Sequence, residues 1–348
     1  MSNVRITLAP VRDLDALAPV WRALEAIAAP SFFQSWTWVG CCAAERFTDP
    51  LLLSVERAGG IAGIALLNRA HGRLWLHESG DPALDAVYVE HNGVLLARDA
   101  ADLLPGCLGA LLAPACLIGR RVRLAGVDAA QLAAARQAGV VRVLREHAAP
   151  CVDLTTLAAG PDGYFARLSA NTRQQLRRSD RAFAGSGTLA VARAATVEQA
   201  WDFLDALAAL HQTTWTARGK PGAFADPAFR RFHRALLARA VPRGEAALLR
   251  ISGAAGVIGY LYNFHLRGRV LAYQSGFDYA AAPRHGKPGL TCHHAAIEQA
   301  RAEGMAVYDF LAGAARYKTS LATGATNLFW LEAAPRRSLA ALRLRLGA

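Results

Sequence analysis

The chain resembles itself at a fixed offset of 196 residues. The segment SVERAGGIAGIALLNRAHGRLWLHESGD begins at Ser54, and LRISGAAGVIGYLYNFHLRGRVLAYQSGFD begins at Leu249. In both copies, apolar and β-branched runs are separated by glycines, which predicts three strands joined by tight turns. Residues that recur at the offset include Gly63 and Gly259, Ser79 and Ser275, and Gly80 and Gly276. An aromatic-containing helical segment precedes each copy, so we expect two related α/β domains.

The two domains are expected to meet near CVDLTTLAAGPDG, at residues 151–163. We therefore assign residues 1–155 to an N-terminal domain and residues 156–348 to a C-terminal domain. A chain of 348 residues is long enough for two domains of ordinary size. In the second domain, Thr196 and Gln199 have the spacing of a capping box, so a helix is predicted to begin there.

The second copy continues into a segment that the first copy matches only loosely. Residues 282–310 predict a loop, a helix from about Thr291, a stop at Gly304 and a strand to Phe310. The counterpart at residues 93–126 has the helix and the strand but lacks the glycine–lysine loop. We therefore expect the chemistry to reside in the second copy, with the N-terminal domain degenerate.

The loop RHGKPG lies between a predicted strand and a predicted helix. Such a loop lets backbone N–H groups and the positive end of the helix face an anion. The predicted phosphate-binding residues are Arg284, Gly286, Lys287 and Gly289. The alternative is an ordinary loop with a Pro-Gly turn.

The segment SANTRQQLRRSDRAF, residues 169–183, predicts a helix that carries arginines at every fourth position. These are Arg173, Arg177 and Arg181. Like charges at this spacing repel one another slightly. One interpretation is that the three arginines contact phosphates or another acidic group of a substrate. The alternative is a solvated face that pairs with distant carboxylates.

Only three of the 39 basic residues are lysines, namely Lys220, Lys287 and Lys318. Arginine and lysine differ in geometry and in how readily they lose a proton, so lysine in an arginine-rich chain suggests a specific need. Lys220 lies in TWTARGKPGAF, a predicted loop that repeats the GKPG of the second copy. This loop is either a substrate-facing element or a simple turn.

The stretch YDFLAGAARYKTSLATG combines an acidic residue at a strand end with a Tyr-Lys pair. Asp309 could accept a proton or orient a nucleophile. Lys318, beside Tyr317, could stabilise developing negative charge. The alternative is a structural ion pair of Asp309 with Lys318 or Arg316.

The histidine, serine and cysteine side chains give no strong prediction of a metal site or a nucleophile. His293 and His294 are adjacent and do not share a helix face, which makes them a poor metal site, and no metal is expected. Ser275 and Cys292 lack a nearby base in the sequence, so neither is favoured as a nucleophile. The cysteines form no CxxC motif and sit mostly among apolar neighbours, which favours buried, reduced thiols. They are Cys41, Cys42, Cys107, Cys116, Cys151 and Cys292.

The net charge of +12 favours anionic partners such as CoA phosphates, RNA, acidic glycans or lipid headgroups. Compositional drift toward arginine is the alternative explanation. The N-terminus lacks the apolar core of a signal peptide, and the uncharged residues 103–119 are interrupted by prolines. They fall short of the roughly 20 apolar residues that span a bilayer, so we expect a cytoplasmic protein without a transmembrane segment.

Four segments in order, ANTRQQLRRSDRAF, YQSGFD, KPGLTCHHAAIEQARAEG and YDFLAGAARYK, resemble the CelD-like (cellulose-biosynthesis-like) acetyltransferases. These belong to the GNAT superfamily and are related to the FemAB aminoacyltransferases. The resemblance covers about residues 30–330. It implies two tandem GNAT-like domains, each a mixed, mostly antiparallel sheet flanked by helices. It also implies acyl transfer from a thioester, usually an acyl-CoA, to an amine.

The family pattern for the pyrophosphate loop is matched at Arg284 and Gly289, but Lys287 stands where an inner glycine belongs. The Tyr317-Lys318 pair is similar to an element that lies by the substrate in FemAB-like proteins. No segment resembles the helical arm with which some relatives hold tRNA.

For such a reaction, Asp309 is our first candidate for the base that deprotonates the amine, and Asp278 is the second. Lys318 or the backbone N–H groups of residues 273–276 would stabilise the oxyanion. Tyr317 or Tyr273 would protonate the leaving thiolate. The acceptor is expected to be an amino sugar or an amino-acid-like amine, in envelope, polysaccharide or secondary metabolism. The alternatives are transfer from an aminoacyl-tRNA, and a non-catalytic pair of domains that binds an acidic glycan or a protein.

Overall fold

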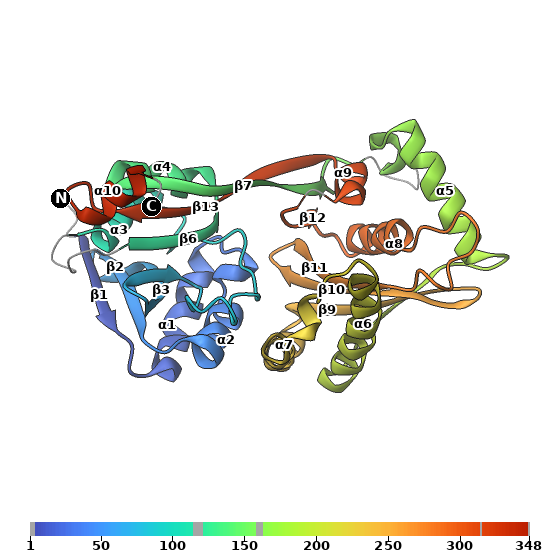
Figure 1. Cartoon of the computed structure of the whole chain (residues 1–348), viewed down its shortest axis with the longest axis horizontal. Coiled ribbons are helices and arrows are strands. Elements are labelled where there is room, and N and C mark those ends of the chain that lie inside the picture. Colours follow the sequence, from blue (N-terminus) through green and yellow to red (C-terminus); the bar gives the residue numbers. More distant parts are fainter. Residues whose placement is uncertain (1–3, 114–120, 158–162, 314, 347–348) are drawn as a thin grey trace. The chain divides into compact units, whose positions relative to one another are not determined.

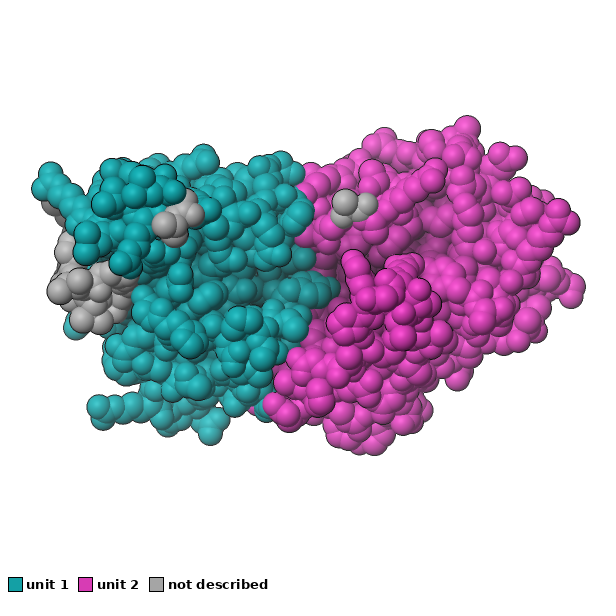
Figure 2. All heavy atoms as spheres, in the orientation of Figure 1, with its two compact units in different colours: residues 1–147, 327–348 teal, residues 148–326 magenta. Residues whose placement is uncertain are grey.

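The computed structural model describes residues 4–113, 121–157, 163–313 and 315–346. The chain forms two compact units (Figure 2). Unit 1 contains residues 1–147 and 327–348, and unit 2 contains residues 148–326. Residues 327–348 therefore pack with unit 1, whereas we expected them to belong to the C-terminal domain, residues 156–348. Cys116 lies outside the described residues.

Unit 1 is an α/β unit with one mixed sheet. Neighbouring strands follow the order β1-β2-β3-β4-β6-β13, in which only β4 and β6 are parallel. Its elements are β1 (Val4–Pro10), α1 (Leu14–Ile27), α2 (Trp36–Arg46), β2 (Pro50–Arg57), β3 (Gly60–Ala70), β4 (Arg73–Leu76), β5 (Leu95–Leu96), α3 (Leu104–Leu111), β6 (Arg121–Val127), α4 (Ala129–Ala138), most of β7 (Val140–Asp153), most of β13 (Gly324–Ala334) and α10 (Leu339–Leu346).

Unit 2 repeats this plan (Figure 1). Its strand order is β7-β12-β11-β10-β9-β8, and again only one pair, β11 with β12, is parallel. Its elements are the end of β7, α5 (Ala170–Ala184), β8 (Ala190–Arg193), α6 (Val197–Ala217), α7 (Pro227–Ala240), β9 (Ala246–Gly253), β10 (Gly256–Leu266), β11 (Arg269–Phe277), α8 (Pro288–Ala302), β12 (Val307–Asp309) and α9 (Arg316–Leu321).

The internal repeat corresponds to the strand meanders β2-β3-β4 and β9-β10-β11. In each meander the second and third strands are joined by a two-residue turn, His71-Gly72 or Arg267-Gly268. All four residues have positive φ, between 49° and 74°, as the tightest hairpin turns require. The two turns are 196 residues apart, so the structure confirms the repeat. Ser79 and Ser275 differ, because β4 ends at Leu76 whereas β11 includes Ser275.

The last strand of each copy completes the sheet of the other unit. β6 pairs with β13, which comes from the second copy, through Glu332 and Arg123 among others. β12 pairs with the end of β7, which comes from the first copy, through Asp309 and Cys151. This exchange of strands explains why the units are not two consecutive halves of the chain.

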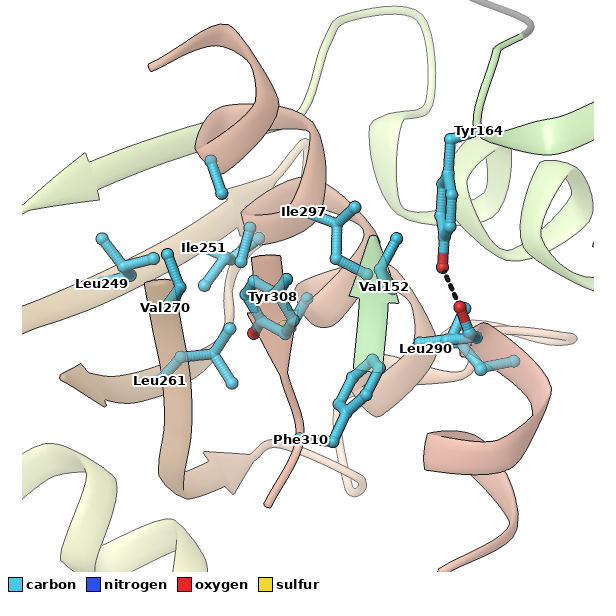
Figure 3. Close-up of a cluster of buried hydrophobic side chains, with 14 of the residues drawn as sticks. Val152, Tyr164, Leu249, Ile251, Leu261, Val270, Leu290, Ile297, Tyr308 and Phe310 are labelled. Atoms are coloured by element: carbon cyan, nitrogen blue, oxygen red, sulfur yellow. Dashed lines mark hydrogen bonds between the residues drawn. The ribbon is translucent and has the colours of Figure 1, made fainter. Parts of the chain in front are cut away.

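Helices cover both faces of the unit 2 sheet. α8 and α5 pack on one face over a core that includes Leu261, Val270, Ile297 and Tyr308 (Figure 3). α6 packs on the other face, and α7 meets the same face through His233, whose ring contacts those of Tyr262 and Tyr273. Local signals placed the helices correctly: Ser169 caps α5, Thr196 caps α6, and Gly304 adopts a φ of 73° just after α8. In the described part of the chain, no helix has the length and apolar character that crossing a membrane requires.

Candidate active site

The first turn of α8 offers backbone N–H groups beside basic side chains. Gly289 and Leu290 lie in this turn, and their N–H groups have no hydrogen-bond acceptor among the described residues. The Lys287 N–H is already used, because it donates to Ser179 Oγ at 2.8 Å. Lys287 Nζ donates to Gln175 Oε1 at 2.6 Å. Residues 284 and 287 are exposed, so both predicted cations of this loop can reach a ligand.

A hydrogen-bonded cluster holds the start of α8 against α5. The hydroxyls of Ser179 and Thr291 are 2.8 Å apart, and Thr291 donates to Asp180 Oδ1 at 2.7 Å. The other oxygen of Asp180 lies 2.8 Å from His294 Nδ1. Burial raises the pKa of the Cys292 thiol well above its usual value, with a smaller contribution from Asp180. Cys292 therefore stays protonated and inert, while His294 ties the two helices together.

The three arginines at every fourth position of α5 differ in their contacts and in their exposure. Arg173 donates to the carbonyl of Leu168 at 2.7 Å and is half-buried. Arg177 is exposed and lies over the ring of Phe165, with 5.2 Å from its guanidinium carbon to the ring centre. Arg181 is exposed and donates to the carbonyl of Arg177 at 3.1 Å. Only the last two can meet a large acidic ligand without a rearrangement.

Asp309 is completely buried at the end of β12. Its Oδ2 pairs with Arg269 Nη2 at 3.2 Å, and its Oδ1 accepts the Leu311 N–H at 2.8 Å. Lys318 Nζ donates to the carbonyls of Leu311 and Ala312, at 3.2 and 2.9 Å. These contacts hold the turn after β12 and leave both groups occupied in this structure.

Tyr317 and His293 form a stacked pair next to that turn. Their rings are 4.9 Å apart and inclined by 14°. Burial raises the pKa of Tyr317 to about 12, with a smaller effect from Tyr279. His293 Nδ1 lies 3.0 Å from the hydroxyl of Tyr308. The predicted Tyr317 therefore sits against a buried histidine for which the sequence assigned no role.

Strands β11 and β12 part where this cluster begins. They pair only from Arg269 to Leu271, the first three residues of β11, so the edge of β11 beyond Leu271 has no β12 partner. Asp278 follows β11 directly, and its Oδ1 accepts the N–H groups of Ala280 and Ala281, at 3.0 and 2.9 Å. Its Oδ2 has no partner among the residues that the structure describes. Asp278 is thus the more available of the two predicted bases.

The two remaining predicted residues lie on other surfaces. Tyr273 is buried in an aromatic cluster with His233, Tyr262 and Phe264, between the sheet and α7. Lys220 is exposed, and its Nζ lies 5.7 Å from the centre of the Trp215 ring. The structure therefore brings together the α8 loop, Asp278 and the Tyr317–His293 stack, and it leaves Tyr273 behind the sheet.

The sequence contained one overlooked signal. Asn263 and His265 are two positions apart in an otherwise apolar strand, so they share one face of β10. That face meets α8, and both residues are buried. Buried polar side chains need partners, which makes such a pair a candidate for a role beyond packing.

Residues 170–319 match the family model for the acetyltransferase (GNAT) domain. The matched segment, which makes up most of unit 2, is a GNAT-type transferase domain. No curated protein matches the chain in sequence.

Solved structures share the fold of the whole chain at low identity. FemX superposes with a TM-score of 0.61 and 9% identity, over 98% of this chain and 99% of FemX. The L-PGS of Bacillus licheniformis gives a TM-score of 0.52 and 10% identity, over 94% of each chain. The C-terminal domain of a lysylphosphatidylglycerol synthetase from Agrobacterium fabrum gives 0.51 and 13%, over 82% of this chain and 84% of that one. These similarities concern the fold alone, and they extend over both units of the chain.

Proposed function

We propose that unit 2 transfers an acyl group from an acyl-CoA to an amine acceptor. The observation that carries this proposal is the first turn of α8, where the Gly289 and Leu290 N–H groups are available. A helix N-terminus with free N–H groups favours a phosphate. Arg284 and Lys287 add positive charge at the same place. The phosphates of CoA would bind there, with the thioester directed toward the unpaired edge of β11.

The chemistry requires a base, an oxyanion site and a group near the departing sulfur. Asp278 would accept a proton from the amine, whose nitrogen then attacks the thioester carbonyl carbon. Backbone N–H groups on the open edge of β11 would hold the oxyanion. The C–S bond then breaks, the acyl group remains on nitrogen, and the nitrogen releases its second proton to solvent as the amide forms. Asp309 would have to leave Arg269 and Leu311 before it could act as the base.

Tyr317 would act on the thiolate as a hydrogen-bond donor. With its pKa raised to about 12, its hydroxyl is protonated at neutral pH. A thiol has a pKa of about 8.5, so full proton transfer from this tyrosine to the thiolate is unfavourable. Solvent would supply the proton after the CoA leaves.

A second candidate is transfer of an aminoacyl group from a charged tRNA. The net charge of +12 and the exposed Arg177 and Arg181 favour a large anionic donor. The resemblance to the CelD-like acetyltransferases instead favours acyl-CoA and an amino sugar or amino-acid-like acceptor. The donor therefore decides between the two candidates.

The test incubates the purified chain separately with acetyl-CoA, with longer acyl-CoAs and with charged tRNA, each with a panel of amino sugars and amino acids. Mass spectrometry then identifies acylated products. Acylation from an acyl-CoA supports the proposal, and acylation from tRNA alone replaces it with the second candidate. Binding of a donor without turnover against the whole panel would support the non-catalytic alternative.

A further inference from the structure

A cavity of about 10 Å³ lies inside unit 2 between α8 and the sheet. Its polar lining includes Asn263 and His265 from β10 and Gln299 from α8. Three buried atoms of these residues, Asn263 Oδ1, His265 Nε2 and Gln299 Oε1, have no hydrogen-bond partner among the residues that the structure describes. A space of roughly 10–15 Å³ holds one water molecule when polar groups surround it.

The partners of His265 determine where its proton lies. His265 Nδ1 is 2.7 Å from Arg193 Nη2, and a guanidinium can only donate. Nδ1 therefore accepts, and the proton of the neutral ring is on Nε2. Burial, assisted by the charge of Arg193, lowers the pKa of His265 to about 4, so the ring is neutral at physiological pH. The cavity thus presents one donor and two acceptors, which matches the hydrogen bonds of a single water.

The side chain of Asn263 links the cavity to Tyr308. The Asn263 side chain hydrogen-bonds to the Tyr308 hydroxyl and lowers its pKa, although burial has the larger, opposite effect. Because Asn263 Oδ1 has no hydrogen-bond partner in the described part of the chain, its amide nitrogen is the group that donates to Tyr308. The Tyr308 O–H is then free to donate to His293 Nδ1, 3.0 Å away. Tyr308 is fully buried at the centre of the core in Figure 3, so water from the surface does not compete.

The chain of hydrogen bonds ends at His293. If Nδ1 accepts from Tyr308, the neutral ring carries its proton on Nε2, and Nε2 is buried with no partner among the described residues. Burial, assisted by the charge of Lys318, lowers the pKa of His293 to about 3. His293 is therefore neutral and a poor base, but it is a hydrogen-bond donor beside Tyr317. Donation into Nδ1 polarises the ring and strengthens the Nε2–H as a donor.

We propose that one water molecule occupies the cavity beneath α8 and completes a row of hydrogen bonds that runs from His265 through Asn263 and Tyr308 to His293. This hydrogen-bonded row holds His293 with its Nε2–H ready to donate to the carbonyl oxygen of the acyl group. This role rests on the acyl transfer proposed above. It gives His293 the task of stabilising negative charge that the sequence suggested for Lys318. No proton is transferred along the chain, whose members only fix one tautomer and orient one ring.

The first experiment needs no substrate. The full chain is labelled with 15N-histidine, and the signals of its 10 histidines are assigned by single substitutions. We expect the Nε2–H tautomer at both His265 and His293, and a cross-peak between the His265 Nε2–H and a long-lived water. Tyr308→Phe should mix the His293 tautomers. Tyr164→Phe is the matched control, because its buried hydroxyl donates elsewhere, to the Leu321 carbonyl at 2.6 Å.

An Nδ1–H tautomer at His293 would reverse the direction of the chain and overturn the proposal. So would an unchanged His293 tautomer in Tyr308→Phe, or a His265 proton with no water contact. These results do not depend on whether the protein transfers acyl groups.

The second experiment tests the donor role with acetyl-CoA and whichever amine of the panel is acylated. His293→Phe keeps a ring against Tyr317 but removes the donor. We expect kcat to fall about a hundredfold, the scale of losing one oxyanion donor, with KM for acetyl-CoA within about twofold. His293→Gln, which restores a neutral N–H donor, should recover part of this loss. An unchanged kcat in His293→Phe overturns the donor role, whereas a wild-type chain that acylates nothing from acetyl-CoA overturns the proposed function and the donor role with it.

Discussion

Arg269 and Asp309 form an ion pair in unit 2, with 3.2 Å between Nη2 and Oδ2. Arg269 begins β11 and Asp309 ends β12, the two parallel strands that part immediately afterwards. The second carboxylate oxygen accepts the Leu311 N–H, and the side chain is fully buried. A carboxylate with both oxygens engaged is well placed to hold a turn and poorly placed to take a proton from a substrate.

Asp309→Asn is therefore expected to lower the stability of the fold while leaving the catalytic rate nearly unchanged. Loss of the charged hydrogen bond should reduce the free energy of unfolding by about 1–3 kcal/mol. The larger losses in this range apply to ion pairs in which both partners are buried. The side chain of Arg269 is 41% exposed, so we expect a loss in the lower part of the range. Urea titration measures the loss, and activity per folded molecule should be retained. A rate drop of a hundredfold with unchanged stability would instead make Asp309 the base.

Asp278→Asn should show the opposite behaviour. The asparagine oxygen can still accept the N–H groups of Ala280 and Ala281, so the melting temperature should change little. Loss of a general base lowers the rate by about a hundred- to ten-thousandfold. Steady-state kinetics on the variant check this, and a rate near that of the wild type would remove Asp278 from the mechanism.

The double variant Arg284→Ala/Lys287→Ala should weaken CoA binding by about 1–3 kcal/mol, the scale of hydrogen bonds to charged groups. Arg231→Ala/Arg239→Ala is the matched control, because it removes the same charge from exposed positions on α7. Calorimetry should show a loss only in the first variant. Equal affinities in the two variants would mean that the α8 loop does not hold the donor.

The arginines of α5 should separate into structural and binding positions. Arg173→Gln removes a hydrogen bond to the Leu168 carbonyl and should lower the melting temperature. Arg177→Gln/Arg181→Gln should leave stability nearly unchanged and should weaken the salt dependence of binding to CoA or tRNA, because fewer charges act at long range. Affinity measured across a salt series decides the second point. A large stability loss in the double variant with normal binding would make these arginines structural as well.

Three buried histidines should make the protein acid-sensitive. Burial lowers the pKa of His77 and His265 to about 4 and that of His293 to about 3. The unfolded chain takes up these protons below about pH 6.5, and the folded chain does not, so stability falls as the pH drops below that value. Each histidine should reduce the free energy of unfolding by about 2 kcal/mol between pH 7 and pH 5.

Urea unfolding of the wild type and His293→Phe at both pH values isolates the contribution of one histidine. The variant should lose less stability on acidification. Parallel pH profiles for the two proteins would show that His293 is protonated in the folded state.

Local features of the sequence predicted much of the fold. The 196-residue repeat, its paired turn glycines and the caps at Ser169, Thr196 and Gly304 all act through neighbouring backbone groups. They therefore located the meanders and the main helices of unit 2. The resemblance across the second copy also placed the transferase domain correctly. The roles of the site residues stay predictions, because no ligand or activity has tested them.

The sequence by itself determined that two related α/β domains exist and that the second carries a glycine–lysine loop ahead of a helix. It also determined where the hairpins of the second domain turn. These features are local, because glycine φ angles and helix caps depend on residues a few positions apart. Only the tertiary structure decided that the last strands of the two copies are exchanged, that Asp309 is buried against Arg269 forty residues away, and that Asn263, Tyr308 and His293 meet beneath α8. Burial and long-range pairing set which carboxylate is available and which tautomer a histidine adopts, and neither is encoded within a local window of the chain.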